Sequence, residues 1–134
     1  MLLQGQWPHP FPLLIAWLKD NVGISAVSKL PDDMKDHLPC VMVTPAPGGG
    51  QGADYTRTRS VDIDVYAADW KSMADITGRI EASIFRLGGR GNRYGYVDAA
   101  RITEFSQIAY ERAAGVLRCT ATASLDMRPK TSLK

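Results

Sequence analysis

The chain has 134 residues and a formal net charge of +2 at pH 7, and its residues are 45% hydrophobic and 22% charged. These ordinary globular values exclude a disordered chain and a fibrous repeat, and so small a net charge gives no reason by itself to expect nucleic-acid binding. We expect one domain over residues 1–134, in which residues 1–10 and 128–134 are extended.

The first predicted element is a helix that starts at residue 11 or 12 and ends near residue 21. Proline is well placed in a first helical turn, and Gly23 provides a typical helix stop. Four apolar residues share one face at helical spacing: Leu13, Leu14, Trp17 and Leu18. The apolar run over residues 13–18 is too short for a signal peptide or a membrane span, so we expect mature structure and no membrane contact.

Several short elements are predicted next, namely a strand over residues 25–30, a helical turn over 31–37 and a strand over 39–44. The glycine-rich segment 45–54 has no apolar anchor, so it is predicted to be a mobile loop. The following strand, residues 55–67, is longer than a small domain is wide. Its polar first half is expected to project as an arm with its partner strand, which favours contact with a neighbouring subunit.

The spacing of the apolar residues changes from two to 3.6 after Asp69, which is a good N-cap residue. The apolar face of the predicted helix consists of Trp70, Met73, Thr77, Ile80, Ile84 and Leu87. We expect this face to be buried against the apolar side of the strand over residues 61–65. Gly88 and Gly89 are expected to end the helix.

The last third of the chain contains a second glycine-rich loop, residues 88–95, and two predicted strands over residues 101–110 and 115–127. Apolar and polar residues alternate along the last strand, so we expect one of its faces to be buried and the other to be exposed to solvent. The predicted fold class is therefore α+β, a mainly antiparallel sheet with helices packed on one face in the order α-β-β-α-β-β.

Two aspartates, Asp62 and Asp64, lie two residues apart on a strand and are therefore on the same face. A hard cation such as Ca²⁺ or Mg²⁺ would accept such a pair, but it needs further oxygen ligands. The alternative is a solvated strand face whose carboxylates pair with arginines of the next strand. The residues favour this second interpretation.

No motif indicates catalysis, a cofactor or a metal. Cys40 and Cys119 lack CxxC spacing and are expected to be buried, reduced thiols. His9 and His37 are too isolated to form a catalytic relay. The glycine-rich segments lack the Lys-Ser/Thr ending of a phosphate-binding loop. We therefore predict a protein that is not an enzyme.

The charges are divided unevenly along the chain. Residues 1–85 contain seven Lys/Arg and ten Asp/Glu, net −3, whereas residues 86–134 contain nine and four, net +5. Such a division suits contact between copies in an assembly, although a solvated basic segment is an equal alternative. The candidate interface residues are Tyr55, Arg57, Arg59, Arg90 and Arg93. Basic residues mixed with aromatic ones occur in protein interfaces and in single-strand nucleic-acid sites, and we favour protein contacts.

Four stretches carry a family resemblance: PLLIAWLKDN, PCVMVTPAPGGG, RSVDIDVYAADW and ADITGRIEASIF. Together with the final pair of strands, they resemble the tail terminator proteins of long-tailed siphophages, especially phages of actinobacteria. The resemblance covers residues 11–127, and VDIDVYA followed by the amphipathic helix carries most of it.

This resemblance implies a structural role in a virion. Tail terminators form hexameric rings that cap the tail tube, end its polymerisation and provide the tail side of the head–tail junction. The implied partners are further copies of this chain, the tail tube protein and head–tail connector proteins, while genomic DNA passes through the lumen without sequence-specific binding. The implied location is the virion tail, after assembly in the host cytoplasm. Another head–tail connector or head-completion protein, and a nucleic-acid-binding module, remain as alternatives.

Overall fold

The computed structural model describes residues 9–51, 57–110 and 114–128, and it contains two α-helices, one 3₁₀ turn and six strands in these ranges. The helical elements are α1 (Pro10–Val22), η1 (Met34–His37) and α2 (Trp70–Leu87). The strands are β1 (Cys40–Gln51), β2 (Arg57–Ala67), β3 (Arg90–Asn92), β4 (Gly95–Ile102), β5 (Ser106–Ile108) and β6 (Leu117–Met127).

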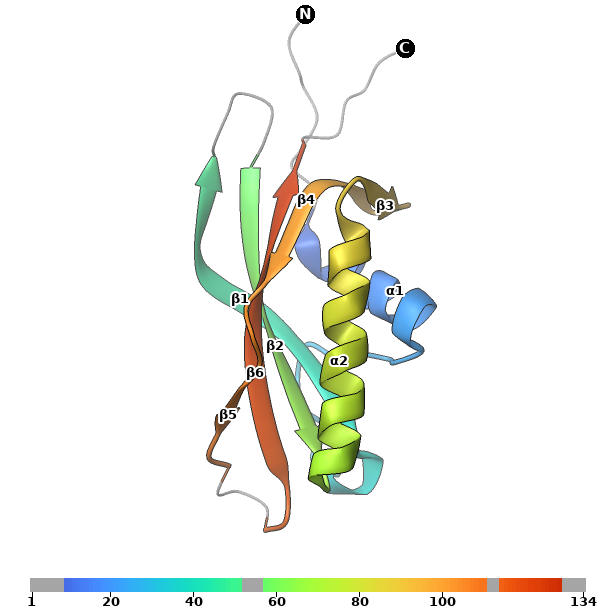
Figure 1. Ribbon diagram of the computed structural model, residues 1–134, viewed down its shortest axis with the longest axis vertical. Coiled ribbons are helices and arrows are strands. Elements are labelled where there is room, and N and C mark those ends of the chain that lie inside the picture. Colours follow the sequence, from blue (N-terminus) through green and yellow to red (C-terminus); the bar gives the residue numbers. More distant parts are fainter. Residues whose placement is uncertain (1–8, 52–56, 111–113, 129–134) are drawn as a thin grey trace, which may run out of the picture.

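All six strands belong to one antiparallel sheet in the order β1-β2-β6-β4-β3, with β5 paired to β6. β6 lies at the centre of this sheet. Its whole length pairs with β2 on one side, while β4 and β5 share its other side. Figure 1 shows that α1 and α2 lie on the same face of the curled sheet. The predicted α+β class and the single helix-covered face are confirmed.

The main core lies between the helices and this covered face. Alternate residues of β2 point into it, and the register places Val61, Ile63 and Val65 opposite the small or apolar residues of β6. α2 contributes its buried side, which consists of Met73, Ile76, Ile80, Ser83, Ile84 and Leu87. Each large side chain buried in this way contributes roughly 1.5–3 kcal/mol before the loss of entropy is subtracted. The two helices are also joined directly, because the indole Nε1 of Trp17 donates to the Ser83 carbonyl at 2.9 Å.

The first turn of α2 confirms one prediction and corrects another. Asp69 is the N-cap, and its carboxylate accepts a hydrogen bond from the backbone N–H of Ser72 at 2.7 Å. Trp70 was expected in the core, but it is 53% exposed. At 100° per residue, Trp70 is turned roughly 90° from the centre of the arc formed by the buried residues of α2, whereas Met73 of the same turn lies within that arc. The indole therefore protrudes into solvent.

The prediction of a loop over residues 45–54 is wrong for the part that the structure describes, because β1 continues to Gln51. Residues 52–54 lie outside the described residues. A register shift between Pro45 and Gly49 absorbs the irregular sequence, and pairing with β2 then resumes. Glycine carries no side chain that could mark a strand face, so the sequence pattern concealed this pairing.

Pro45 is compatible with β1 because β1 is an edge strand. The backbone of Val27 bonds to the Val41 carbonyl and the Val43 N–H on the outer side of β1. By alternation, the nitrogen of Pro45 also points outward, away from β2. A residue without an N–H therefore costs no bond to β2 at this position. This Val27 contact is an isolated bridge to β1, so the strand predicted over residues 25–30 is reduced to one residue pair.

The predicted arm is also corrected. The part of β2 from Arg57 to Arg59 pairs with β1 on one side and with Met127–Leu125 of β6 on the other, so it is an interior part of the sheet. The loop predicted over residues 88–95 contains β3 and a turn into β4. The strand predicted over residues 101–110 is interrupted between β4 and β5.

Candidate interaction surfaces

The second face of the sheet, here called the open face, carries the polar residues that alternate with the core residues. On β2 and β6 these are Thr58, Ser60, Asp62, Asp64, Thr120, Thr122, Ser124 and Asp126. Many of them bond across the strands. Thr122 donates its hydroxyl to the Asp62 carboxylate at 2.7 Å, and Thr58 donates to Asp126 at 2.7 Å.

Asp64 forms the most buried ion pair of the open face. Its side chain is 6% exposed, and Nη2 of Arg118 lies 2.8 Å from its carboxylate. The guanidinium of Arg118 also lies over the ring of Tyr66, 5.7 Å from the ring centroid. The sequence alternative in which Asp64 pairs with an arginine of the next strand is confirmed, but Asp64 is buried and not solvated.

Asp126 is held from both neighbouring strands. Arg101 of β4 donates two hydrogen bonds of 3.1 Å to its carboxylate, while Thr58 of β2 donates the third. The bonds from Arg101 lower the pKa of Asp126, and the bond from Thr58 acts in the same direction. These contacts connect three strands across the open face.

The part of the chain that the structure describes contains no cluster of three or more His, Cys, Asp or Glu side chains suited to a metal ion. Asp62 accepts a hydrogen bond from Thr122, and Asp64 accepts one from Arg118, so the two carboxylates have different partners. His37 contacts Asp33 at 2.8 Å on an exposed turn. A separate finding concerns the bilayer: none of the described helices is long and apolar enough to span it.

Both thiols are free and buried, as predicted. Cys40 lies in a row with Tyr66 on the open face, whereas Cys119 pairs with Val65 and faces the helices. The sheet therefore separates the two sulfur atoms. Burial raises the pKa of each thiol.

The candidate interface arginines gather at one end of the sheet, here called the basic end. The register connects Arg57, Met127, Val97 and Arg90 in one row across β2, β6, β4 and β3. Three strand spacings separate the two arginines of this row, roughly 14 Å. Paired residues share a sheet face, so both arginines lie on the helix side. Arg59 occupies the next position on this side of β2.

Arginine–tyrosine contacts extend the basic end. The guanidinium of Arg93 lies 4.8 Å from the ring centroid of Tyr94 and donates to its hydroxyl. Arg128 lies 5.4 Å from the ring centroid of Tyr96 and pairs with Asp98, which raises the pKa of the arginine. Sequence reasoning missed Arg128, because only the β4–β6 pairing brings it here. Tyr55, the remaining predicted interface residue, lies outside the described residues.

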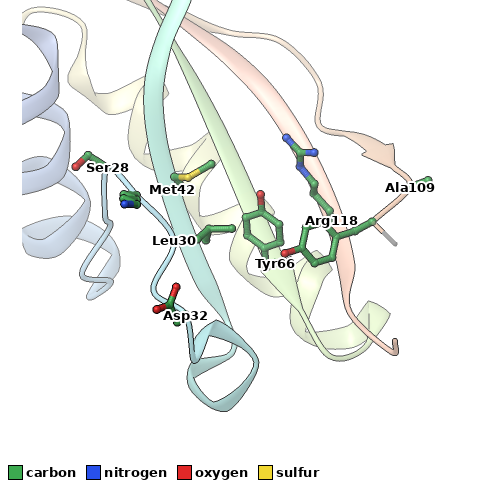
Figure 2. A pocket seen from close by; sticks show the side chains of 9 residues that line it. Ser28, Leu30, Asp32, Met42, Tyr66, Ala109 and Arg118 are labelled. Carbon is green, nitrogen blue, oxygen red and sulfur yellow. The ribbon is translucent and has the colours of Figure 1, made fainter. Parts of the chain in front are cut away.

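A pocket of about 780 Å³ lies on the open face at the end of the sheet opposite the basic end. Its lining residues are Ser28, Lys29, Leu30, Asp32, Met42, Tyr66, Ala109, Tyr110 and Arg118. Figure 2 shows the Leu30 side chain directed toward the ring of Tyr66, with Arg118 on the other side of that ring. Tyr66 and Tyr110 meet edge to face with their centroids 5.2 Å apart. Burial raises the pKa of Tyr66. No sequence motif marked this pocket, because its residues come from five separate parts of the chain.

Comparison with known proteins shows a similarity in fold. No protein-family model matches the sequence. No curated protein matches it either. Among solved structures, the chain is similar to one described as part of the virion of a native gene transfer agent particle, with a TM-score of 0.59 and 11% sequence identity. The match covers 87% of this chain and 92% of the other, so the two share their fold over nearly their whole lengths.

Proposed function

We propose that this chain is a structural protein of a phage-like virion, and specifically a tail terminator. The observation that carries this proposal is the fold shared with a chain of a gene transfer agent virion over 92% of that chain's length. The sequence resemblance to tail terminators supports the same assignment independently. In this role, six copies form a ring that caps the tail tube, stops its growth and presents the tail side of the head–tail junction.

The distribution of contact groups supports a subunit that works by association. One face of the sheet is covered by helices, while the other presents hydroxyls, carboxylates and guanidinium groups to its surroundings. The basic end presents Arg90 and Arg93 as exposed side chains. A ring requires two different patches on each subunit, and the open face and the helix face provide two chemically distinct surfaces. The basic end is then the surface that meets the connector or the tube.

The same arginines could instead bind nucleic acid, since they are interleaved with tyrosines. The contacts argue for protein binding, because Arg93 and Arg128 already lie over the rings of Tyr94 and Tyr96. A base could stack on the ring face that the guanidinium covers only by displacing it. The surfaces described above are equally suited to a different head–tail connector, and only the partner would distinguish the two roles.

The decisive experiment adds purified protein to tail tube protein that is polymerising, and it measures tube length by electron microscopy and complex mass by light scattering. We expect shorter tubes with a ring of copies at one end. A chain that stays monomeric and leaves tube length unchanged would contradict the proposal. Binding at the connector side without any effect on the tube would favour a connector protein.

Variants of the basic end sharpen this experiment. Arg90→Gln with Arg93→Gln should weaken capping or connector binding, whereas Arg86→Gln, an exposed arginine on α2, should not. A nucleic-acid-binding module predicts something different, namely salt-dependent affinity for free DNA that the same double variant abolishes.

A further inference from the structure

Trp70 is an exposed aromatic side chain that its own fold leaves without a cover. It lies in the first turn of α2, and 53% of it is accessible to solvent. It is flanked by the exposed charges of Asp69 and Lys71. Tryptophan is enriched at the energetic centres of protein interfaces, because it combines a large apolar area with an N–H donor.

The pocket on the open face has the chemistry that an indole requires. Leu30 and Met42 provide apolar contacts, and the rings of Tyr66 and Tyr110 provide aromatic ones. The guanidinium of Arg118 lies at the same place, and a cation is attracted to the face of tryptophan more than to that of any other side chain.

The rim of the pocket also suits the surroundings of Trp70. The hydroxyl of Ser28 and the carboxylate of Asp32 are acceptors for the indole N–H. Lys29 of the rim carries the opposite charge to Asp69, and Asp32 carries the opposite charge to Lys71. Two pairs of opposite charge, Lys29 with Asp69 and Asp32 with Lys71, therefore favour entry of the indole into the pocket.

The relative positions of the two features prevent contact within one chain. The pocket is built on Met42, Tyr66 and Arg118 of the open face, while α2 covers the other face. Both lie at the end of the sheet where β2 ends and α2 begins. Two different patches at the same level and on opposite sides of a subunit suit a head-to-tail contact, which generates a ring when the rotation between neighbouring subunits closes.

We infer that the pocket receives Trp70 of a second copy of this chain. The inference rests on the proposed ring, for which it names one contact between subunits. Each subunit gives its indole to one neighbour and accepts the indole of the other, so every pocket in a closed ring is filled by a partner residue.

Cysteine cross-linking tests this contact. Lys71→Cys, which keeps the indole of Trp70 in place, and Ala109→Cys proteins are mixed and oxidised with diamide, and the expected product is a disulfide-linked heterodimer. Phe85→Cys, at a residue of α2 that is 70% exposed, provides the matched control and should not link to Ala109→Cys. The native Cys40 and Cys119 are buried and do not compete.

Self-association measured by native mass spectrometry provides the second readout. Trp70→Ala should weaken association more than about tenfold, because it removes the indole. Ala109→Trp should have a similar effect, because the new side chain would fill the pocket. Phe85→Ala, at the other end of α2, should weaken association much less than Trp70→Ala. A ring that forms equally well with Trp70→Ala and gives no cross-link would overturn this contact and leave the proposed function intact. A wild-type chain that never associates, alone or on tubes, would overturn both.

Discussion

The buried ion pair between Asp64 and Arg118 should make Asp64→Ala one of the more damaging changes on the open face. Breaking a fully buried pair costs roughly 3–5 kcal/mol, whereas an exposed pair contributes about 0–1 kcal/mol. Asp64 is 6% exposed and Arg118 is 28% exposed, so water can solvate the abandoned guanidinium only in part. Nε of Arg118 has no hydrogen-bond partner among the described residues, which leaves the cation more dependent on Asp64. We expect a loss of about 2–3 kcal/mol in the free energy of unfolding.

Urea unfolding followed by circular dichroism measures this loss. With a slope of roughly 2 kcal/mol per molar urea, the midpoint should fall by about 1–1.5 M while the slope stays the same. The double variant Asp64→Ala/Arg118→Met should recover part of the loss, because the unpaired cation is then gone. Asp62→Ala is the matched control. It removes a carboxylate that bonds to the neutral Thr122 hydroxyl and should cost only about 1 kcal/mol.

Two results would refute this reasoning. One is an Asp64→Ala protein whose stability lies within about 0.5 kcal/mol of wild type, the range of ordinary surface changes. The other is a rise in the Tm of the wild type with Ca²⁺ or Mg²⁺ that Asp64→Ala abolishes, since this would restore the cation interpretation of the aspartates.

Three further predictions concern the core, the titration and one turn. Ile80→Ala, at a completely buried position of α2, should lower the free energy of unfolding by about 2–5 kcal/mol in urea, and a smaller loss than this would mean that the core closes around the cavity. Because Arg101 lowers the folded-state pKa of Asp126, the stabilisation is present above the unfolded pKa of 3.8 and is lost as pH falls below it. Thermal melts between pH 2 and 6 should therefore fall more steeply at the acid end for wild type than for Asp126→Asn, and parallel curves would contradict this assignment. Gly91→Ala should destabilise the β3–β4 turn, because its new Cβ would lie 2.2 Å from the Gly95 carbonyl oxygen. Hydrogen exchange of the turn amides should become faster, and an unchanged exchange rate would contradict this prediction.

The sequence predicted the elements whose side chains carry a period. α2 and β6 were found with nearly correct ends, because their core residues recur at helical and strand spacing and Asp69 marks the start of the helix. β3, the end of β1 and residues 96–100 of β4 were missed. The first two segments are glycine-rich and have no side chains to show a period, and their strand pairing is imposed by β4 and β2.

The surfaces were predictable only in part for a related reason. That Asp64 would meet an arginine was foreseen, but the partner, Arg118, is 54 residues away and is chosen by the register of β2 and β6. The exposure of Trp70 follows from its place at the margin of the buried arc of α2, and the prediction missed it because it put Thr77 and not Ile76 on the apolar face. The pocket forms where five segments of the chain meet, so only the fold could reveal it.

Pro45 of β1 affects how this protein behaves when it is abundant. Exposed strand edges are the places where proteins add strands to one another and grow into fibrils. On the outer margin of β1, Val27 already bonds to the Val41 carbonyl and the Val43 N–H. The next outward-pointing residue is Pro45, which has no N–H, so an incoming strand would lack a donor there. This interruption disfavours strand addition along β1 and favours recognition between copies through side chains, which suits closed assemblies of a fixed number of subunits.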